Sequence, residues 1–502
     1  MQAAEITAAE LPPLPTRRGF VKWYSQPVVQ VCLIAMVCFL CPGGIGGGGQ
    51  VDPKASNDGS YSTFAATSFF SGTLCNRLGA RLTLGVGAAG YALYIGAFLS
   101  YNINENSGFV VAAGALLGIC AGMLWTAQGS MTLAYATEST KGRLFALFWM
   151  IFNMGAVLGS AIELGITYDS EASTVSNSVY AAFLAIAAIG AFIPLTLISP
   201  GLMVRVDGSR VVVPVHPSWK TEIVGLYRCL RYNVWILLLF PYFLSSNWFY
   251  TWQFNSFNGA LFTLRTRALN SMLYWLFQVF ASLAFGVAID STRFRRVIRA
   301  WGGLVFVSAL CMAVWGGAYH FQNRPPSRDY TRADLAEPRA PEFARIDFKD
   351  SGYAGHVVLY IFMGIMDAIW QNYACECPLL SLFLSSEADS ATSLRADWLM
   401  GAMSNDSSQL AHLVGFYKAI QSAGAAGVFR MDSNLAPYMT ELAVSWGLNA
   451  AGILFVIPVI LLRVTDHTAE AVINADDAPK AVAESAGEKE DGSVDEKKGS
   501  MA

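Results

Sequence analysis

The chain has 502 residues, of which 54% are hydrophobic and only 14% are charged. Soluble domains carry about 25% charged residues, so this composition excludes a soluble enzyme of this length. The apolar residues also fall into blocks of roughly the 20 residues that cross the hydrocarbon core of a bilayer. The composition therefore predicts a polytopic membrane protein with the lipid bilayer as its main partner.

The formal net charge of −3 is dominated by the C-terminal tail. Residues 464–502 are rich in Glu, Asp, Ala and Lys and poor in large apolar residues, which predicts a disordered acidic cytosolic tail. The remainder of the chain is close to neutral and contains no basic block. Nucleic acid is therefore not expected as a partner.

The predicted elements begin after a polar N-terminal tail, residues 1–26. No small-residue cleavage site follows the first apolar run, so we expect a start-anchored helix rather than a removed signal peptide. Six spans are expected at 27–48, 60–76, 82–100, 108–136, 143–167 and 179–199. A second six are expected at 234–253, 270–289, 300–318, 353–374, 408–429 and 440–463. The expected organisation is thus an N-terminal bundle (27–199), a polar linker (200–233) and a C-terminal bundle (234–463).

Lys and Arg are distributed unequally between the connections. The short connections at 101–107, 168–178 and 431–439 contain none, whereas the loops at 76–82 and 289–300 and the linker are basic. Two outer connections depart from this pattern: 254–269 contains Arg265 and Arg267, and 319–352 contains basic residues balanced by acidic ones. Because cytosolic loops carry the excess of Lys and Arg, both termini are predicted to be cytosolic. The sequon Asn405-Asp406-Ser407 then lies on the cytosolic side and is expected to carry no glycan.

Two charged loops repeat along the chain. GTLCNRLGAR (72–81) and GVAIDSTRFRR (286–296) each begin with Gly near the inner end of the second span of a set. In each, three residues and then Asn or Asp precede an Arg-rich stretch. The period is about 214 residues, from Gly72 to Gly286. Two six-helix halves repeated in parallel are typical of the major facilitator fold.

These loops resemble the G-x-x-x-D-R-x-G-R-R motif of the major facilitator superfamily. The resemblance assigns a cytosolic gating loop to Gly72, Asn76, Arg77, Gly79, Arg81, Gly286, Asp290, Arg295 and Arg296. The Gly would allow two helices to approach closely, and the acid would form a latch that opens and closes with the transport cycle. The alternative is that these Arg residues only follow the positive-inside rule, which explains one copy better than two.

Four further stretches are similar to the fungal Unc-ninety-three-like branch of this superfamily. They are GGGGQVD (46–52), RTRALN (265–270), WLMGAMSND (398–406) and GFYKAIQSAGAAGVFRMD (415–432). The resemblance implies an all-α membrane protein of two pseudo-symmetric six-helix bundles with 11–12 transmembrane helices. Members of the branch are regarded either as transporters or as regulators of ion channels and of membrane-protein trafficking. One departure is helix 1, where only 14 residues separate Pro27 from Pro42, so the helix is either truncated or completed through the following glycines.

Polar residues inside predicted spans are candidates for a transport pathway, because burying them in a membrane is costly. They are Asp367, Gln371, Glu163, Asn153, Gln128, Asn247 and Gln421. Asp367 and Gln371 are four residues apart and share a helix face. Asp367 lies near mid-span and is the leading candidate for a cavity or proton-relay role. The alternative for the Asn and Gln side chains is that they form hydrogen bonds between helices. The alternative for Glu163 is that it lies near the outer end of its helix and extends its carboxylate to the membrane–water interface.

Catalytic chemistry finds no support in the sequence. No nucleophile–base set, His cluster or Walker motif is present, so neither an enzyme nor a cofactor is expected. The Cys residues fall in or beside apolar runs rather than in outer loops, so no disulfide is expected. Cys375-Glu376-Cys377 is too short to form a metal site.

Residues 375–397 interrupt the predicted tenth helix with a polar, Ser-rich stretch. The codons for Cys375-Glu376-Cys377 can contain GTGAGT, a common fungal splice donor, and those for Ala396-Asp397 can contain a CAG acceptor. Removing the intervening bases keeps the reading frame and joins NYA to WLMGAMSND through one Tyr, as in the resembling family. We therefore predict that this segment is a translated intron. Transcript sequencing is expected to show the shorter mRNA as the dominant form, and a dominant mRNA that retains these codons would refute the idea.

The sequence thus predicts a secondary transporter of a small solute, by alternating access and with a proton as the coupling ion. The alternative is a non-transporting regulator of an ion channel or of membrane-protein trafficking. Asn76, where the motif has Asp, weakens the latch and favours the regulator, whereas the polar residues of helices 5, 7 and 10 favour the transporter.

Overall fold

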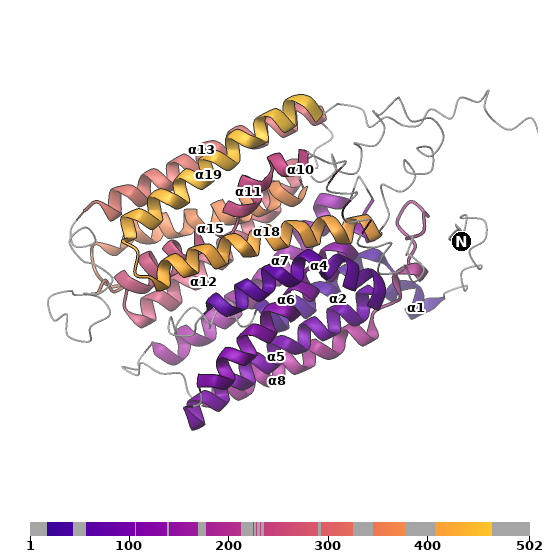
Figure 1. Ribbon diagram of the computed structural model, residues 1–502, viewed down its shortest axis with the longest axis horizontal. Coiled ribbons are helices and arrows are strands. Elements are labelled where there is room, and N and C mark those ends of the chain that lie inside the picture. Colours follow the sequence, from indigo (N-terminus) through magenta and orange to yellow (C-terminus); the bar gives the residue numbers. More distant parts are fainter. Residues whose placement is uncertain are drawn as a thin grey trace, which may run out of the picture.

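The computed structural model describes residues 18–43, 57–105, 107–137, 140–168, 177–211, 235–289, 293–324, 345–376 and 407–463, together with positions 224, 227 and 231. In Figure 1 the helices form two groups that lie side by side along a common long direction. The first described helix and the end of the last helix lie at the same end of the molecule. Among the described residues, seven helices are long and apolar enough to cross a membrane.

The N-terminal half contains six spans. They are α2 (Pro27–Cys38) with the π-helical turn η1 (Phe39–Gly43), α4 (Asn57–Leu78), α5 (Ala80–Asn104), α6 (Ser107–Tyr135), α7 (Lys141–Thr167) and α8 (Asn177–Thr196). A short amphipathic segment, α1 (Gly19–Tyr24), precedes them, and a 3₁₀ turn, η2 (Pro200–Leu202), follows them.

The C-terminal half has the corresponding helices. They are the broken seventh span α10 (Trp235–Leu238), α11 (Phe240–Ser245) and η3 (Trp252–Gly259), then α12 (Leu264–Ile289), α13 (Arg296–Gln322), α15 (Tyr353–Glu376), α18 (Ser407–Ser433) and α19 (Tyr438–Arg463). The all-α, two-bundle fold is therefore confirmed.

Two predicted spans differ from the structure. Helix 1 was expected to reach residue 48, but its described part ends at Gly43, and the following glycines lie outside the described residues. Helix 7 was expected to run unbroken from 234 to 253. It is interrupted before α11 because Pro241 has no amide hydrogen to donate to the preceding turn, and it continues as a π-helix to Gly259. The predicted intron at 375–397 and the stretch 398–406 lie outside the described residues, apart from the last two residues of α15.

The two halves meet mainly where α4 packs on α18 and α7 packs on α12, and α6 also contacts α18. Glycines allow the close approach at the first pair. A Cβ added at Gly415 of α18 would lie 2.8 Å from the carbonyl oxygen of Ser68 and 3.3 Å from the amide nitrogen of Gly72. The close approach at Gly415 thus brings α18 against the backbone of α4 at Gly72, the first glycine of the repeated loop motif.

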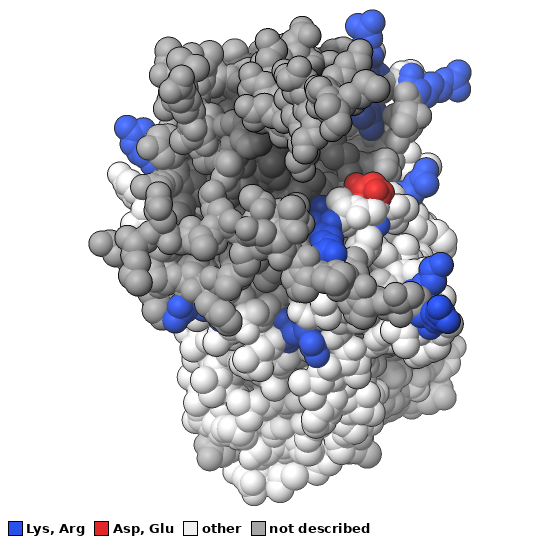
Figure 2. Space-filling view, turned by 90° about the vertical axis from the view of Figure 1, so that its right-hand side faces the viewer, with Lys and Arg blue, Asp and Glu red and all other residues white. Residues whose placement is uncertain are grey.

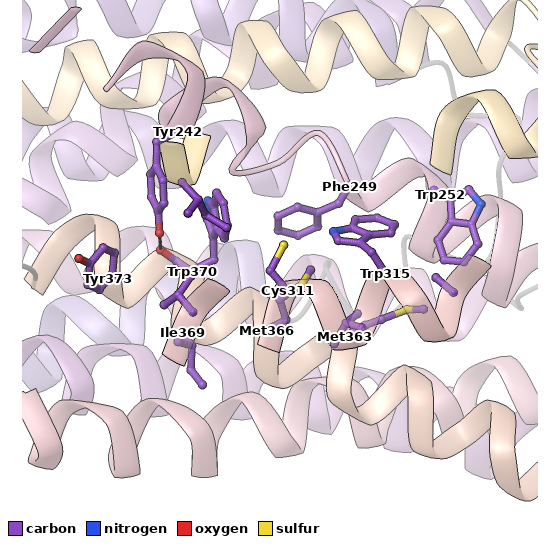
Figure 3. Packing of buried hydrophobic residues seen from close by; sticks show 14 of the residues in the cluster. Tyr242, Phe249, Trp252, Cys311, Trp315, Met363, Met366, Ile369, Trp370 and Tyr373 are labelled. Atoms are coloured by element: carbon purple, nitrogen blue, oxygen red, sulfur yellow. Dashed lines mark hydrogen bonds between the residues drawn. The ribbon is translucent and has the colours of Figure 1, made fainter. Parts of the chain in front are cut away.

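Aromatic packing fills the C-terminal half, as Figure 3 shows. The ring of Tyr242 stacks on that of Trp370 with centroids 4.2 Å apart, and the Tyr242 hydroxyl donates to the Trp370 carbonyl at 3.0 Å. Trp252 and Trp315 are fully buried and pack on each other at 5.7 Å. Trp252 and Trp370 are therefore core residues.

The loop between α4 and α5 consists of one residue, Gly79, whose φ of 83° is reached easily only by glycine. The Arg81 side chain then crosses to α8 and donates to the Leu195 carbonyl at 2.7 Å, at the end of that helix where a cation is favoured. This contact lies within one half. In the second copy of the motif, Gly286 is buried within α12, Arg295 is the N-cap of α13, and Asp290 lies outside the described residues.

Candidate functional site

A carboxylate lies near the middle of α15, inside the protein. Asp367 is fully buried, and its side-chain oxygens accept hydrogen bonds from four neutral groups. The donors are the Tyr250 hydroxyl at 3.1 Å, the Tyr274 hydroxyl at 3.0 Å, the Gln278 amide at 2.9 Å and the Gln371 amide at 3.4 Å. A buried carboxylate held by neutral donors is expensive in its charged form and can gain a proton at low cost.

Gln371, one helical turn after Asp367, extends the network towards α11 and α18. Its amide nitrogen donates to the Ser246 carbonyl at 3.0 Å and to Asn247 at 3.2 Å. Its oxygen accepts from the Tyr417 hydroxyl at 2.7 Å and from the Gln421 amide at 2.9 Å. Four of the predicted residues, Asp367, Gln371, Asn247 and Gln421, therefore lie in one hydrogen-bonded cluster.

The cluster reaches the N-terminal half at two places. At one, Asn153 of α7 donates to the Gln278 side chain of α12 at 3.3 Å, and Gln278 donates in turn to Asp367. At the other, Lys418 of α18 donates to Gln421 at 2.8 Å and places its ammonium 5.0 Å from the ring centroid of Trp125 in α6. A single polar network thus connects the two halves through helices near their midpoints.

Two predicted residues lie apart from this network. Gln128 donates to Thr132 within its own helix at 3.4 Å, as expected of a structural amide. Glu163 lies four residues before the end of α7, buried, and interacts electrostatically with Arg267 near the start of α12. Glu163 therefore belongs to a contact between α7 and α12 at the end of the molecule away from α1, rather than to the Asp367 cluster.

Several members of the cluster were not predicted from the sequence. Lys418 was the clearest omission, since a cation inside an otherwise apolar span is as informative as an acid. Gln278 was identifiable in the same way, as an amide inside the predicted span 270–289. Tyr250 and Tyr274 had no signal of their own, because tyrosines are frequent in the aromatic seventh and eighth spans.

Accessible side chains border the network on both halves. Lys418, Trp125, Tyr250 and Asn247 are each partly exposed, while Asp367, Gln278 and Gln421 are buried behind them. The indole N–H of Trp125 also donates to the Tyr91 hydroxyl at 3.2 Å. This hydrogen bond holds the Trp125 ring in its position against the Lys418 ammonium. The arrangement offers a cation, aromatic rings and amides to a small polar molecule, with a protonatable carboxylate directly behind. Within the described residues, no group of three or more His, Cys, Asp or Glu side chains is placed to hold a metal ion.

Comparisons with known proteins agree with this architecture. Residues 59–325 match the Major Facilitator Superfamily. A UNC93-like protein of Schizosaccharomyces pombe is 41% identical over 450 residues, which cover 88% of this chain and 83% of the relative. UNC93-like protein 1 of Arabidopsis thaliana is 36% identical over 441 residues, which cover 85% of this chain and 89% of the relative.

Solved structures share the fold at low identity. The Escherichia coli fucose:proton symporter superposes with a TM-score of 0.53 at 13% identity, covering 88% of this chain and 100% of its own. The proton:xylose symporter superposes with a TM-score of 0.56 at 12% identity, and the match covers 86% of this chain and 96% of the symporter. On the sequence matches and the fold together, this chain is a UNC93-like member of the major facilitator superfamily.

Proposed function

We propose that this protein is a secondary transporter that moves a small polar solute by alternating access, coupled to a proton on Asp367. The observation that carries this proposal is the buried Asp367, held by neutral donors within a polar network that joins the two halves. Alternating access requires the two halves to move relative to each other, so a group at their junction is well placed to link protonation to that motion.

The Tyr274 hydroxyl supplies a means of sensing the proton. Its oxygen lies 3.0 Å from Asp367 and 3.0 Å from the Gln253 side-chain oxygen, yet it has only one hydrogen to donate. When Asp367 is charged, that hydrogen points to the carboxylate. When Asp367 is protonated, its own O–H can donate to Tyr274, whose hydrogen then turns to Gln253 in η3. Protonation would in this way alter the contact between α15 and the irregular seventh span.

The solute is expected to lie between Lys418 and Trp125 on one side and Tyr250 and Asn247 on the other. These groups come from both halves, as alternating access requires of a binding site. A molecule that carries both a hydrogen-bond acceptor for Lys418 and an apolar face for the aromatic rings would fit this chemistry.

The charge distribution supports the proposed orientation. Figure 2 shows that described Lys and Arg side chains gather on the end of the molecule that carries α1, with one acidic patch among them. Under the positive-inside rule this distribution supports a cytosolic position for this end, and with it the proposal that both termini are cytosolic. A glycan found at Asn405 would contradict this orientation.

The alternative, a non-transporting regulator of another membrane protein, is favoured by Asn76 in place of the acid of the gating-loop motif. The deciding experiment compares metabolite and ion contents in a deletion strain with those in a strain that re-expresses the wild-type chain. We expect one class of small polar solute to change in the deletion strain and to return on re-expression. Stoichiometric co-purification of a channel with the tagged protein, without any solute change, would instead establish the regulator.

A further inference from the structure

A second cavity lies outside the junction of the two halves, between α4, α5, α6 and α8. Its volume is about 660 Å³, and it lies at the end of the N-terminal half where α4 turns into α5 through Gly79. The cavity shares no residue with the Asp367 network. Its wall combines a polar end with a long apolar side, and neither part is explained by transport through the junction.

The polar end of the cavity presents hydrogen-bond donors. Arg81 uses one terminal nitrogen for the Leu195 carbonyl, while its Nε atom is buried and has no hydrogen-bond partner among the described residues. Tyr135 also lines the cavity, is 1% exposed, and its hydroxyl likewise has no partner among the described residues. The two groups interact electrostatically with each other. An unsatisfied buried donor costs about 1–3 kcal/mol, so both are expected to meet a ligand.

The amino-terminal end of α5 adds to the positive character of this end. The helix begins at Ala80, and its N-cap, Gly79, has no side chain to satisfy the first amide groups. No Asp or Glu side chain occurs among the residues that line the cavity. The polar end is therefore suited to an anion and offers no acceptor to a cationic head group.

The apolar side opens towards the membrane. Leu82 and Val86 of α5 and Phe192 and Leu195 of α8 line the cavity and are 52%, 42%, 68% and 64% exposed. The lining residues of α5 run from Ala80 to Ala89, a rise of about 13 Å at roughly 1.5 Å per residue. A hydrocarbon chain can lie along this length with its polar group at Arg81, whereas a free anion would leave the apolar wall without a partner.

We infer that this cavity binds an anionic phospholipid of the adjacent leaflet. The phosphate accepts hydrogen bonds from Arg81 Nε and the Tyr135 hydroxyl, and one acyl chain lies between α5 and α8. Arg is suited to this contact because its planar guanidinium donates to two phosphate oxygens at once. The first arginine-rich loop thus holds a lipid in addition to any part it has in gating.

The test uses the purified full chain in a neutral detergent and counts bound lipids by native mass spectrometry. Dioleoyl phosphatidylglycerol is titrated against dioleoyl phosphatidylcholine. We expect the wild type to retain one phosphatidylglycerol with an affinity about tenfold higher than for phosphatidylcholine, because the choline ammonium offsets the phosphate charge beside Arg81 and meets no carboxylate in the cavity. Arg81→Ala should reduce this preference because it removes the positive charge. Tyr135→Phe, which removes a donor to the phosphate that both lipids carry, and Val86→Trp, which fills the groove, should each reduce retention of both lipids.

The matched control is Arg295→Ala, which removes one positive charge at the position corresponding to Arg81 in the second repeat. It should leave lipid retention unchanged. Tyr135→Phe keeps the buried ring, so the test remains decisive if Arg81→Ala does not fold. Equal retention of both lipids by the wild type, or unchanged retention of phosphatidylglycerol in Tyr135→Phe, would overturn the proposal. So would inorganic phosphate that displaces phosphatidylglycerol and stabilises the protein equally well, since the site would then be one for a free anion.

Discussion

Asp367→Asn is expected to reduce solute accumulation at least about tenfold, because a hydrogen bond to a charged group contributes roughly 1.5–3 kcal/mol and about 1.4 kcal/mol corresponds to a factor of ten. Asparagine has nearly the same shape but cannot gain or lose a proton. It also places an amide donor among the donors Tyr250, Tyr274 and Gln278, so at least one hydrogen bond must rearrange. The measurement is the solute content of the deletion strain that re-expresses this variant, at several external pH values.

The Asp367→Asn protein should still fold. Asn loses the strong hydrogen bonds that the charged carboxylate accepts, but it also avoids the desolvation cost of burying that charge, and the two effects oppose each other. The matched control is Asp207→Asn, the same change at an exposed residue of the linker that accepts from Ser209 at 2.7 Å. It should retain wild-type transport. Wild-type accumulation and wild-type pH dependence in Asp367→Asn would remove Asp367 from the mechanism and leave the polar network as a structural junction.

Among the glycines that the structure describes, Gly424→Ala is expected to cause the largest loss of stability. Gly424 is buried in α18, and a Cβ there would overlap the carbonyl oxygen of Leu244 in α11. The obstacle is backbone rather than a side chain that can rotate away, so the helices must separate. We expect a loss of about 3 kcal/mol, the upper part of the range for overpacked cores.

The comparison variant is Gly447→Ala in α19, where nothing lies within 4 Å of an added Cβ. Alanine favours a helix by roughly 0.8–1.0 kcal/mol over glycine, so this variant should melt at or above the wild-type temperature. Thermal unfolding of both proteins in the same detergent provides the measurement. Equal melting temperatures for the two variants would show that α18 and α11 can separate without cost.

The sequence alone determined the helical architecture, because hydropathy over a span of about 20 residues and the charge of its flanks are local properties. The repeat from Gly72 to Gly286 predicted the division into two halves. Asp367 could be identified as a candidate because an acidic residue is rare in the middle of a transmembrane span. Breaks within a span were harder to locate. The π-helical course of η3 depends on its neighbours, since Ser256 within it donates to Glu441 of α19 and Asn255 donates to Asp432 of α18.

Only the tertiary structure decided which polar residues act together. Asp367 receives donors from Tyr250 and Gln278, which lie 117 and 89 positions away in the chain, whereas Gln128 finds its partner within its own helix. The difference depends on how each helix is rotated and how closely it approaches its neighbour, and contacts such as Gly364 against the Tyr274 carbonyl set that rotation. The cavity at Arg81 and Tyr135 is likewise a product of packing, because four helices contribute to its wall and no single segment encodes it.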